Sequence, residues 1–428
     1  MSKKAFLQIV FFFVISCSFG QTTQLWNGVV YTTQISDGEM HRFESARYTL
    51  FVPQGLKLIK GVLIHQHGCT MEGTGIQVAT DVQYQAFAKK WGLALLCPDI
   101  YPHGKNCFEW NNPEYGSESS LFAGLDRLAT ISKHPELINA PWLLWGHSGG
   151  GHWSLSMLRK HYNRIIALVA YSAAFDSTFS YPPAVAKVPV LLRHAGDGDL
   201  TASWAKCPLT AIHNFERLRS LNGYASIAHN LKQTHNLSYI RYMAIPFFEA
   251  VLAQRLPLYD GFKLRDMDEN NAWLGDTIPN AGGRIYKASS FTGNKLAMSW
   301  LPDSTSAAKY LEFINTGTVS DHTPPPAPFH CTIKPTKSKD FEILWEADAD
   351  IESGIKYFNI YKNGKLLNRY PHDYDFQYFN TNGDNPILPL APDLRYLIRS
   401  SEGYSKSDKY KISMVNHAGL ESEQTLVK

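Results

Sequence analysis

Short apolar runs alternate with longer amphipathic segments between about residues 25 and 255. The apolar runs have the length of buried strands, and the segments between them carry apolar residues three or four positions apart, as helices do. Buried strands separated by helices are typical of a mostly parallel sheet with helices on both faces. The expected strands are 46–53, 61–67, 93–99, 142–146, 165–172, 188–196 and 224–230, and the expected helices are 82–92, 119–131, 152–162 and 239–255.

The pattern changes after this first domain, which we expect to span 21–255. Residues 256–321 contain aromatic-rich stretches and one short helical pattern, and we expect an accessory segment that packs on the first domain. The proline-rich stretch DHTPPPAP predicts an extended linker. Residues 322–428 alternate between apolar and polar positions, with an Asn-Gly turn at 363–364, which predicts a small all-β sandwich.

The first twenty residues combine a basic start with an apolar run from Ala5 to Ile15. This run is too short to span a bilayer and is typical of a secretory signal peptide. We therefore expect a signal peptide at 1–20, cleaved near Gly20, and a secreted, periplasmic or cell-surface protein of a bacterium. In an alternative interpretation Cys17 becomes the lipidated first residue of a lipoprotein, although VISC matches the usual lipobox poorly. No other segment approaches membrane-spanning length.

Charge and cysteine content limit the partners and cofactors that we expect. The formal charge is +3, it falls to +1 when Lys3 and Lys4 leave with the signal peptide, and no basic run is present to follow a phosphate backbone. Nucleic acid is therefore not an expected partner. Of the six cysteines, five remain after the signal peptide, so at least one thiol is unpaired. Cysteines and histidines show no ligand spacing, and we expect neither a metal nor an organic cofactor.

The stretch WLLWGHSGGGHWSL at 142–155 is the main chemical motif. An apolar run enters the glycines and a helical pattern leaves them, so a strand turns sharply into a helix at Ser148. In a G-x-S-x-G nucleophile elbow the residues two before and two after the serine must be small, as Gly146 and Gly150 are. Such a motif also arises by chance, so it needs an acid, a base and an oxyanion hole to support it.

These partners follow in the chain order of an α/β-hydrolase, which is serine, acid and then histidine. Asp197 and Asp199 come directly after an expected strand. We favour Asp199, because its distance from Gly196 lets the turn direct its carboxylate toward the histidine, but both are also common turn residues. For the base we favour His235, in the loop before the last helix, over His229, which belongs to a strand pattern.

The oxyanion hole requires two backbone amides aimed at the developing negative charge. One is expected from Gly149, the residue after the serine, and the other from the loop HQHGCTMEGTG, where Cys69 is the favoured donor. We also expect a disulfide between Cys69 and Cys107, because their loops meet at the same edge of the sheet.

Four segments resemble secreted esterases. IHQHGCTMEG is similar to the HGCT segment of polyhydroxybutyrate depolymerases and of feruloyl and acetyl-xylan esterases, and NCFEW resembles a Cys-aromatic-x-Trp segment of the depolymerases. The resemblance covers roughly 45–255 and extends to GHSGGG and to THNLSYIRYMAIPFFEAVLAQRLP. It departs at Gly149, where the commoner motif has Ala or Met. DHTPPPAP, WEADADIESGIKYFNIYKNGK and VNHAGLES resemble a fibronectin type III module.

The resemblance implies a serine esterase whose substrates include polymeric carbohydrate esters or polyesters. Only about fifteen residues separate two of the expected strands where other hydrolases insert a cap, so we expect an open groove. The loop 98–119 would form its rim, with Tyr101 and Trp110 binding substrate and Phe108 and Tyr115 beside them. Alternatively, these aromatic residues fill a small core beneath the loop.

Two other functions are compatible with the sequence. A serine peptidase of the prolyl-oligopeptidase type has the same order of catalytic residues, but that family usually carries a large β-propeller before the catalytic domain, and only about 40 residues precede the first expected strand here. A non-catalytic surface or adhesion protein is the other alternative. The intact set of serine, acid and histidine argues against it.

Overall fold

The structure is a computed structural model that describes most of the chain. The described residues are 20–36, 41–104, 106–173, 179–196, 198–199, 206–229, 233–235, 239–258, 261–277, 282–338, 340–379, 393–399, 401 and 403–428. The predicted signal peptide up to residue 19, with Cys17, lies outside them, as does Asp197.

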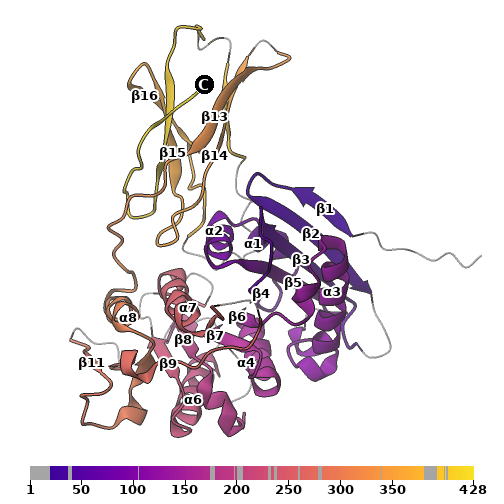
Figure 1. Ribbon diagram of the computed structural model, residues 1–428, viewed down its shortest axis with the longest axis vertical. Helices are drawn as coiled ribbons and strands as arrows, with labels where there is room; N and C mark the ends of the chain where they lie inside the picture. The colour runs from indigo at the N-terminus through magenta and orange to yellow at the C-terminus, as the bar shows by residue number, and fades with distance from the viewer. Residues whose placement is uncertain are drawn as a thin grey trace, which may run out of the picture.

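A large mixed sheet forms the centre of the molecule (Figure 1). Its nine strands have the order β1-β2-β3-β5-β4-β6-β7-β8-β9. The pairs β1–β2, β2–β3 and β3–β5 are antiparallel. The remaining pairs, from β5–β4 to β8–β9, are parallel. The strands are β1 Gln21–Gln24, β2 Gly28–Ser36, β3 Ser45–Pro53, β4 Gly61–Gln66, β5 Leu93–Tyr101, β6 Trp142–His147, β7 Ile165–Tyr171, β8 Val190–His194 and β9 Ala225–His229.

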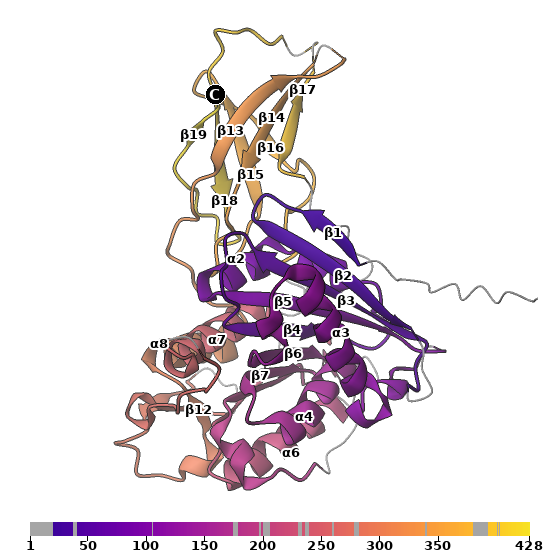
Figure 2. The same cartoon turned by 45° about the vertical axis from the view of Figure 1, so that its right-hand side comes forward.

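Helices cover both faces of this sheet, which confirms the predicted α/β-hydrolase fold class (Figure 2). Alternate side chains of a strand point to opposite faces, so Leu143 lies in one apolar cluster and Leu144 in the other. The cluster with Leu144 includes residues of α3, α4 and α6, and the cluster with Leu143 includes residues of α1, α2 and α7. The helices are α1 Gly75–Ala79, α2 Val82–Trp91, α3 Ser117–Ser132, α4 Gly149–His161, α6 Lys206–Ser220 and α7 Arg241–Arg255.

Short 3-10 turns connect several of these elements. They are η1 Cys107–Glu109, η2 Pro113–Tyr115, η3 Pro135–Ile138, η4 Pro183–Lys187, η5 Glu269–Asn271 and η6 Lys295–Ala297. Within the part of the chain that the structure describes, no helix combines the length and the apolarity needed to cross a bilayer.

The accessory segment packs on the last strand and helix of the central domain. It contains β10 Trp273–Gly275, β11 Ile285–Lys287 and β12 Ser299–Leu301 in one antiparallel sheet, followed by α8 Ser304–Thr316. The hydroxyl of Tyr310 donates to the carbonyl of Ile227 in β9 at 2.8 Å. Trp300 and Phe313 belong to the same apolar cluster as α7, so the two parts share one core.

Two antiparallel sheets form the C-terminal module. The first has the order β13-β14-β17, from Phe329–Pro335, Phe341–Glu346 and Arg395–Ile398, and the second has the order β16-β15-β18-β19, from Lys365–Tyr370, Tyr357–Lys362, Tyr410–Val415 and Thr425–Leu426. Residues from both sheets share one core, including Ile343 and Ile412. The small antiparallel sheets expected after residue 322 are therefore present, while the likeness to fibronectin type III stays a prediction.

The C-terminal module lies directly against α2 and its preceding turn (Figure 1). Val82 and Ala86 of α2 belong to the apolar cluster of the module. The Gln377 amide donates to Asp81 Oδ1 at 2.9 Å, and Asp81 also forms an ion pair with Arg241 at 2.8 Å. A buried polar network and a shared core thus join the module to the domain of the large sheet.

Candidate active site

Ser148 occupies the sharp turn between β6 and α4. Its backbone has φ 50° and ψ −114°, an unfavourable conformation for a residue with a side chain, and its amide donates to the carbonyl of Tyr171 at 2.8 Å. A Cβ on Gly146 would lie 2.2 Å from the Gly150 carbonyl oxygen, and a Cβ on Gly150 would lie 2.4 Å from the Gln66 carbonyl oxygen, so both flanking residues must be small. The sequence GHSGG therefore folds into the strained turn that a nucleophile elbow requires.

His235 and Asp199 meet next to this turn. Nδ1 of His235 lies 2.9 Å from Oδ1 of Asp199, and both side chains are buried. The amide of Ala195 and the hydroxyl of Ser172 donate to Oδ2 of Asp199 at 2.6 and 3.4 Å. The structure thus brings together the favoured acid and the favoured base.

The alternative base, His229, lies at the end of β9 with its ring 4.4 Å from that of His194. Burial, together with the nearby His229, lowers the pKa of His194 to about 3. These two stacked imidazoles are part of the packing between the ends of β8 and β9.

The surroundings of the Asp199–His235 pair favour an ionised acid and a neutral base. Burial opposes ionisation of Asp199, but hydrogen bonds from His235 and Ala195, with the charge of Arg193, outweigh it and lower the Asp199 pKa. Burial also lowers the pKa of His235, and the hydrogen bond with Asp199 offsets only part of this effect. A neutral imidazole beside a carboxylate is the resting state of a general base.

The backbone of His235 is tied to the elbow. Its carbonyl is 3.1 Å from Nε2 of His147 and accepts a hydrogen bond from the Tyr171 hydroxyl. The rings of His147 and Tyr171 stack at 4.3 Å. Because His147 directly precedes Ser148, these contacts fix the loop of His235 relative to Ser148. Sequence reasoning did not identify His147 or Tyr171, although His147 stands inside the elbow motif.

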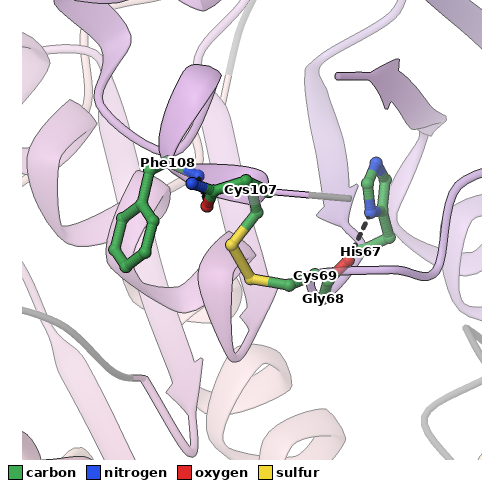
Figure 3. Close-up of a disulfide and its surroundings, with 6 residues drawn as sticks. His67, Gly68, Cys69, Cys107 and Phe108 are labelled. Carbon is green, nitrogen blue, oxygen red and sulfur yellow. Dashed lines mark hydrogen bonds between the residues drawn. A yellow bond between two sulfur atoms is a disulfide. The ribbon is translucent and has the colours of Figure 1, made fainter. Parts of the chain in front are cut away.

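The predicted disulfide between Cys69 and Cys107 is confirmed (Figure 3). It joins the loop after β4 to η1, with the two Cα atoms 5.2 Å apart. A Cβ on Gly149 would lie only 2.4 Å from Sγ of Cys69. The disulfide therefore leaves no room for a side chain at position 149 of this chain.

His67 holds the same loop from its other side. The amide of Ile100 donates to Nε2 of His67 at 3.0 Å, so Nδ1 carries the proton and donates to the Gly68 carbonyl at 2.6 Å (Figure 3). This imidazole links the backbone before Cys69 to β5. The segment with the predicted oxyanion donor is therefore held by a covalent bond and by a buried histidine.

The expected aromatic rim is only partly present. Trp110 is fully buried, with its ring 4.9 Å from His67, so it supports the Cys69 loop and does not line an open groove as we expected. Tyr101 is partly buried, with the guanidinium of Arg47 over its ring. Phe108 is 50% exposed and lies beside the disulfide (Figure 3). Of the aromatic residues in this loop, Phe108 is the best placed to meet a ligand.

Two groups of side chains among the described residues have enough donor atoms for a metal. The first is Asp199, Cys207 and His235. Its carboxylate and imidazole are already hydrogen-bonded to each other, and burial raises the pKa of Cys207 and so keeps it a neutral thiol. This group therefore fits proton transfer better than metal binding. The second group, Asp321, Asp350 and Glu352, lies where the C-terminal module begins.

No protein-family model and no curated protein matches the chain. Among solved structures, an S-formylglutathione hydrolase from Agrobacterium tumefaciens is 15% identical over 54% of this chain and 96% of its own, with a TM-score of 0.39. A ferulic acid esterase is 13% identical over 53% of this chain and 98% of its own, also with a TM-score of 0.39. A thermostable esterase is 17% identical over 47% of this chain and 54% of its own, with a TM-score of 0.36.

Proposed function

We propose that the protein is a secreted serine hydrolase that cleaves carboxylic esters, with Ser148 as nucleophile, His235 as base and Asp199 as acid. The observation that carries this proposal is the hydrogen bond between buried Asp199 and His235 beside the strained Ser148 turn. The reaction needs no metal and no organic cofactor.

In the proposed mechanism Ser148 Oγ attacks the ester carbonyl while His235 takes the hydroxyl proton. The negative oxygen of the tetrahedral intermediate receives hydrogen bonds from the amides of Gly149 and Cys69. His235 then protonates the leaving alcohol, and an acyl-enzyme remains on Ser148. Water, activated by the same histidine, releases the acid and restores the serine. Asp199 orients the imidazole and stabilises its cation throughout.

The charge environment supports this assignment. Because burial lowers the pKa of His235 below the usual value of about 6.5, the base stays neutral in mildly acidic solution. We therefore expect kcat/KM to fall at acidic pH with a midpoint below pH 6.5, where His235 becomes protonated. A limb centred above pH 6.5 would contradict this assignment.

Esters on polysaccharides, or polyesters, are the proposed substrates. The connection between Tyr171 at the end of β7 and Val190 at the start of β8 is too short for a cap domain, so bulky substrates can approach. Exposed Phe108 next to the oxyanion loop offers a ring on which a sugar or aromatic acyl group can stack.

The first test is hydrolysis of short-chain p-nitrophenyl esters by the purified protein. Ser148→Ala and His235→Ala should each lower kcat by about 10⁴-fold or more, whereas His229→Ala should have a small effect. Circular dichroism should show that the variants remain folded. Cleavage of peptide anilides in place of esters would favour a prolyl-oligopeptidase-like peptidase, and no turnover of either would favour a non-catalytic surface protein.

The second test addresses the substrate. Phe108→Ala should raise KM several-fold for acetylated or feruloylated xylan fragments and leave p-nitrophenyl acetate unaffected, because only binding remote from the ester is lost. Tyr374→Ala is a matched control, since Tyr374 is also 50% exposed but belongs to the C-terminal module. Equal effects of Phe108→Ala on both substrates would contradict a stacking role.

A further inference from the structure

Arg193 is a fully buried arginine in β8, behind the proposed catalytic acid and base. Within the described part of the chain, no carboxylate is in ion-pair contact with its guanidinium. It donates hydrogen bonds to neutral oxygens of Ser172, Gln233 and Thr234. Burying a charge without a contact counter-ion costs several kcal/mol, so a charge kept in this position requires an explanation.

One branch of the guanidinium reaches the acid. Nη1 of Arg193 donates to the hydroxyl of Ser172 at 2.8 Å, and this hydroxyl in turn donates to Oδ2 of Asp199 at 3.4 Å. The positive charge thus lies one hydroxyl away from the carboxylate. In a buried site a charge at this distance strongly favours the ionised acid.

The other branch reaches the loop of the base. Nη2 of Arg193 donates to Oε1 of Gln233 at 3.1 Å and to the carbonyl of Thr234 at 3.2 Å. Thr234 directly precedes His235. Gln233 is itself held by the carbonyl of Gly317, to which its amide donates at 3.0 Å. One planar guanidinium therefore connects the segments that carry the acid and the base.

Packing around these segments leaves little freedom. A Cβ on Gly198 would lie 2.1 Å from the carbonyl oxygen of Gln233, so the two loops are already in close backbone contact. The guanidinium of Arg193 also lies 4.6 Å from the centre of the Tyr171 ring, whose hydroxyl donates to the His235 carbonyl. Arg193 is thus connected to His235 through Thr234 and through Tyr171.

We propose that Arg193 is a positioning residue for ester hydrolysis, whose buried charge keeps Asp199 ionised and whose two branches hold the acid and base loops in register. This inference rests on the proposed function. Arg193 does not touch the reacting atoms and acts through Asp199 and His235.

The charge of Arg193 also has a consequence for the base. A positive charge disfavours protonation of His235, and the pKa of this histidine is lowered by burial first, with His147 and Arg193 adding to the effect. Among the described residues, the other titratable groups near the pair are Cys207 of α6, whose pKa burial raises, His194 of β8, whose pKa burial lowers to about 3, and Tyr171 of β7, whose hydroxyl contacts the His235 carbonyl. Removing the Arg193 charge should therefore raise the pH at which the enzyme loses activity.

The experiment compares Arg193→Met, which removes the charge, with Arg193→Lys, which keeps it. With p-nitrophenyl acetate we expect Arg193→Met to lower kcat about 10- to 100-fold, with KM changed less than about twofold. The acid limb of kcat/KM should move to higher pH by about half a unit or more. Arg193→Lys should keep the limb near its wild-type position and recover only part of kcat, because an ammonium cannot bridge both loops.

Arg219→Met is the matched control. Arg219 is also buried and also donates to carbonyl oxygens, those of Gly223 and Lys295, but at the accessory segment. It should lower stability without moving the acid limb. The Arg193 proposal is overturned if Arg193→Met has the kcat and the acid-limb midpoint of the wild type. It is also overturned if Arg219→Met changes both quantities as much as Arg193→Met does.

Titration of His235 by NMR in ¹³C-histidine-labelled protein gives the same answer without turnover. The His235 pKa should rise in Arg193→Met and stay near the wild-type value in Arg193→Lys. If the wild type hydrolyses no ester, the proposed function fails, while this titration still decides whether Arg193 acts on His235. If Arg193→Met does not fold, the test rests on Arg193→Lys. A reduced kcat with an unchanged acid-limb midpoint supports the proposal, and a wild-type kcat in that variant overturns it.

Discussion

Arg193 and Arg241 are both buried, and both lie with the guanidinium over an aromatic ring, that of Tyr171 and that of Tyr84. They differ in their counter-ions. Arg241 contacts the carboxylate of Asp81 at 2.8 Å, whereas Arg193 reaches the carboxylate of Asp199 through the hydroxyl of Ser172. The charge of Arg241 is neutralised by a carboxylate in direct contact, whereas the charge of Arg193 acts on the Asp199 carboxylate, which it does not contact directly.

The difference separates two uses of a buried charge. At the C-terminal module, Asp81 also accepts the amide of Gln377, so the ion pair with Arg241 joins the module to α7 and α2. Such a contact pair adds specificity to an interface and changes little outside it. In the domain of the large sheet, Arg193 is linked to Asp199 through the hydroxyl of Ser172. We therefore expect damage at the interface to reduce stability, and damage near Ser148 to reduce activity.

The largest effect should follow from Asp199→Asn. The amide cannot stabilise an imidazolium and favours the wrong tautomer of His235, so kcat for p-nitrophenyl acetate should fall about 10⁴-fold while the fold is retained. Steady-state kinetics with circular dichroism measures both. Asp197→Asn is the control and should cost far less. The reverse order would move the acid by two residues.

The next effect should follow from Arg241→Met, and it should appear in stability. Removing this cation leaves the buried carboxylate of Asp81 without its partner, which should lower the free energy of unfolding by about 3–5 kcal/mol. Urea denaturation measures the change. Adding Asp81→Asn keeps the cap of α2 and should restore part of the loss. If folded Arg241→Met lost as much kcat as Asp199→Asn, the interface would affect activity as well as stability, and the proposed difference between the two regions would be wrong.

The smallest effect concerns Asp350 and Asp321, which lie together where the module begins. Burial and the neighbouring Asp321 raise the pKa of Asp350 above its usual value. The folded protein then binds more protons than the unfolded chain between about pH 4 and neutrality, so this group should lower stability as pH rises through that range. Asp350→Asn should remove a pH-dependent loss of about 1 kcal/mol, measured by urea denaturation at pH 5 and pH 7.5. An unchanged pH dependence would show that Asp350 titrates normally.

Local motifs carried most of what the sequence predicted correctly. The Ser148 turn is specified by glycines that have no room for a side chain, and the order of apolar runs specified the parallel sheet. The disulfide followed because parallel strands bring Cys69 and Cys107 to one edge of the sheet. In each case the determining interactions are close along the chain or are fixed by topology.

The sequence pattern did not predict β1, β2 or α6. The other errors and omissions concern side chains whose environment depends on distant segments. Trp110 and Phe108 stand two positions apart in one loop, and nothing in the loop itself shows that Trp110 packs on His67 while Phe108 remains exposed. Arg193 gave a signal that sequence reasoning did not use. An arginine within the apolar run VPVLLRHAG of a buried strand needs internal partners, and these come from residues about 20 and 40 positions away.

The contact between the disulfide and Gly149 also restricts how this sequence can change over evolution. A chain that keeps the bridge cannot accept alanine at 149, since its Cβ would meet Sγ of Cys69 at 2.4 Å. The substitutions therefore have a required order, in which the bridge is lost first and the larger residue enters afterwards. Gly149→Ala should be harmful in the wild type and tolerated beside Cys69→Ala and Cys107→Ala. Among descendants of this sequence, alanine at 149 should occur only in chains that have lost the cysteine pair.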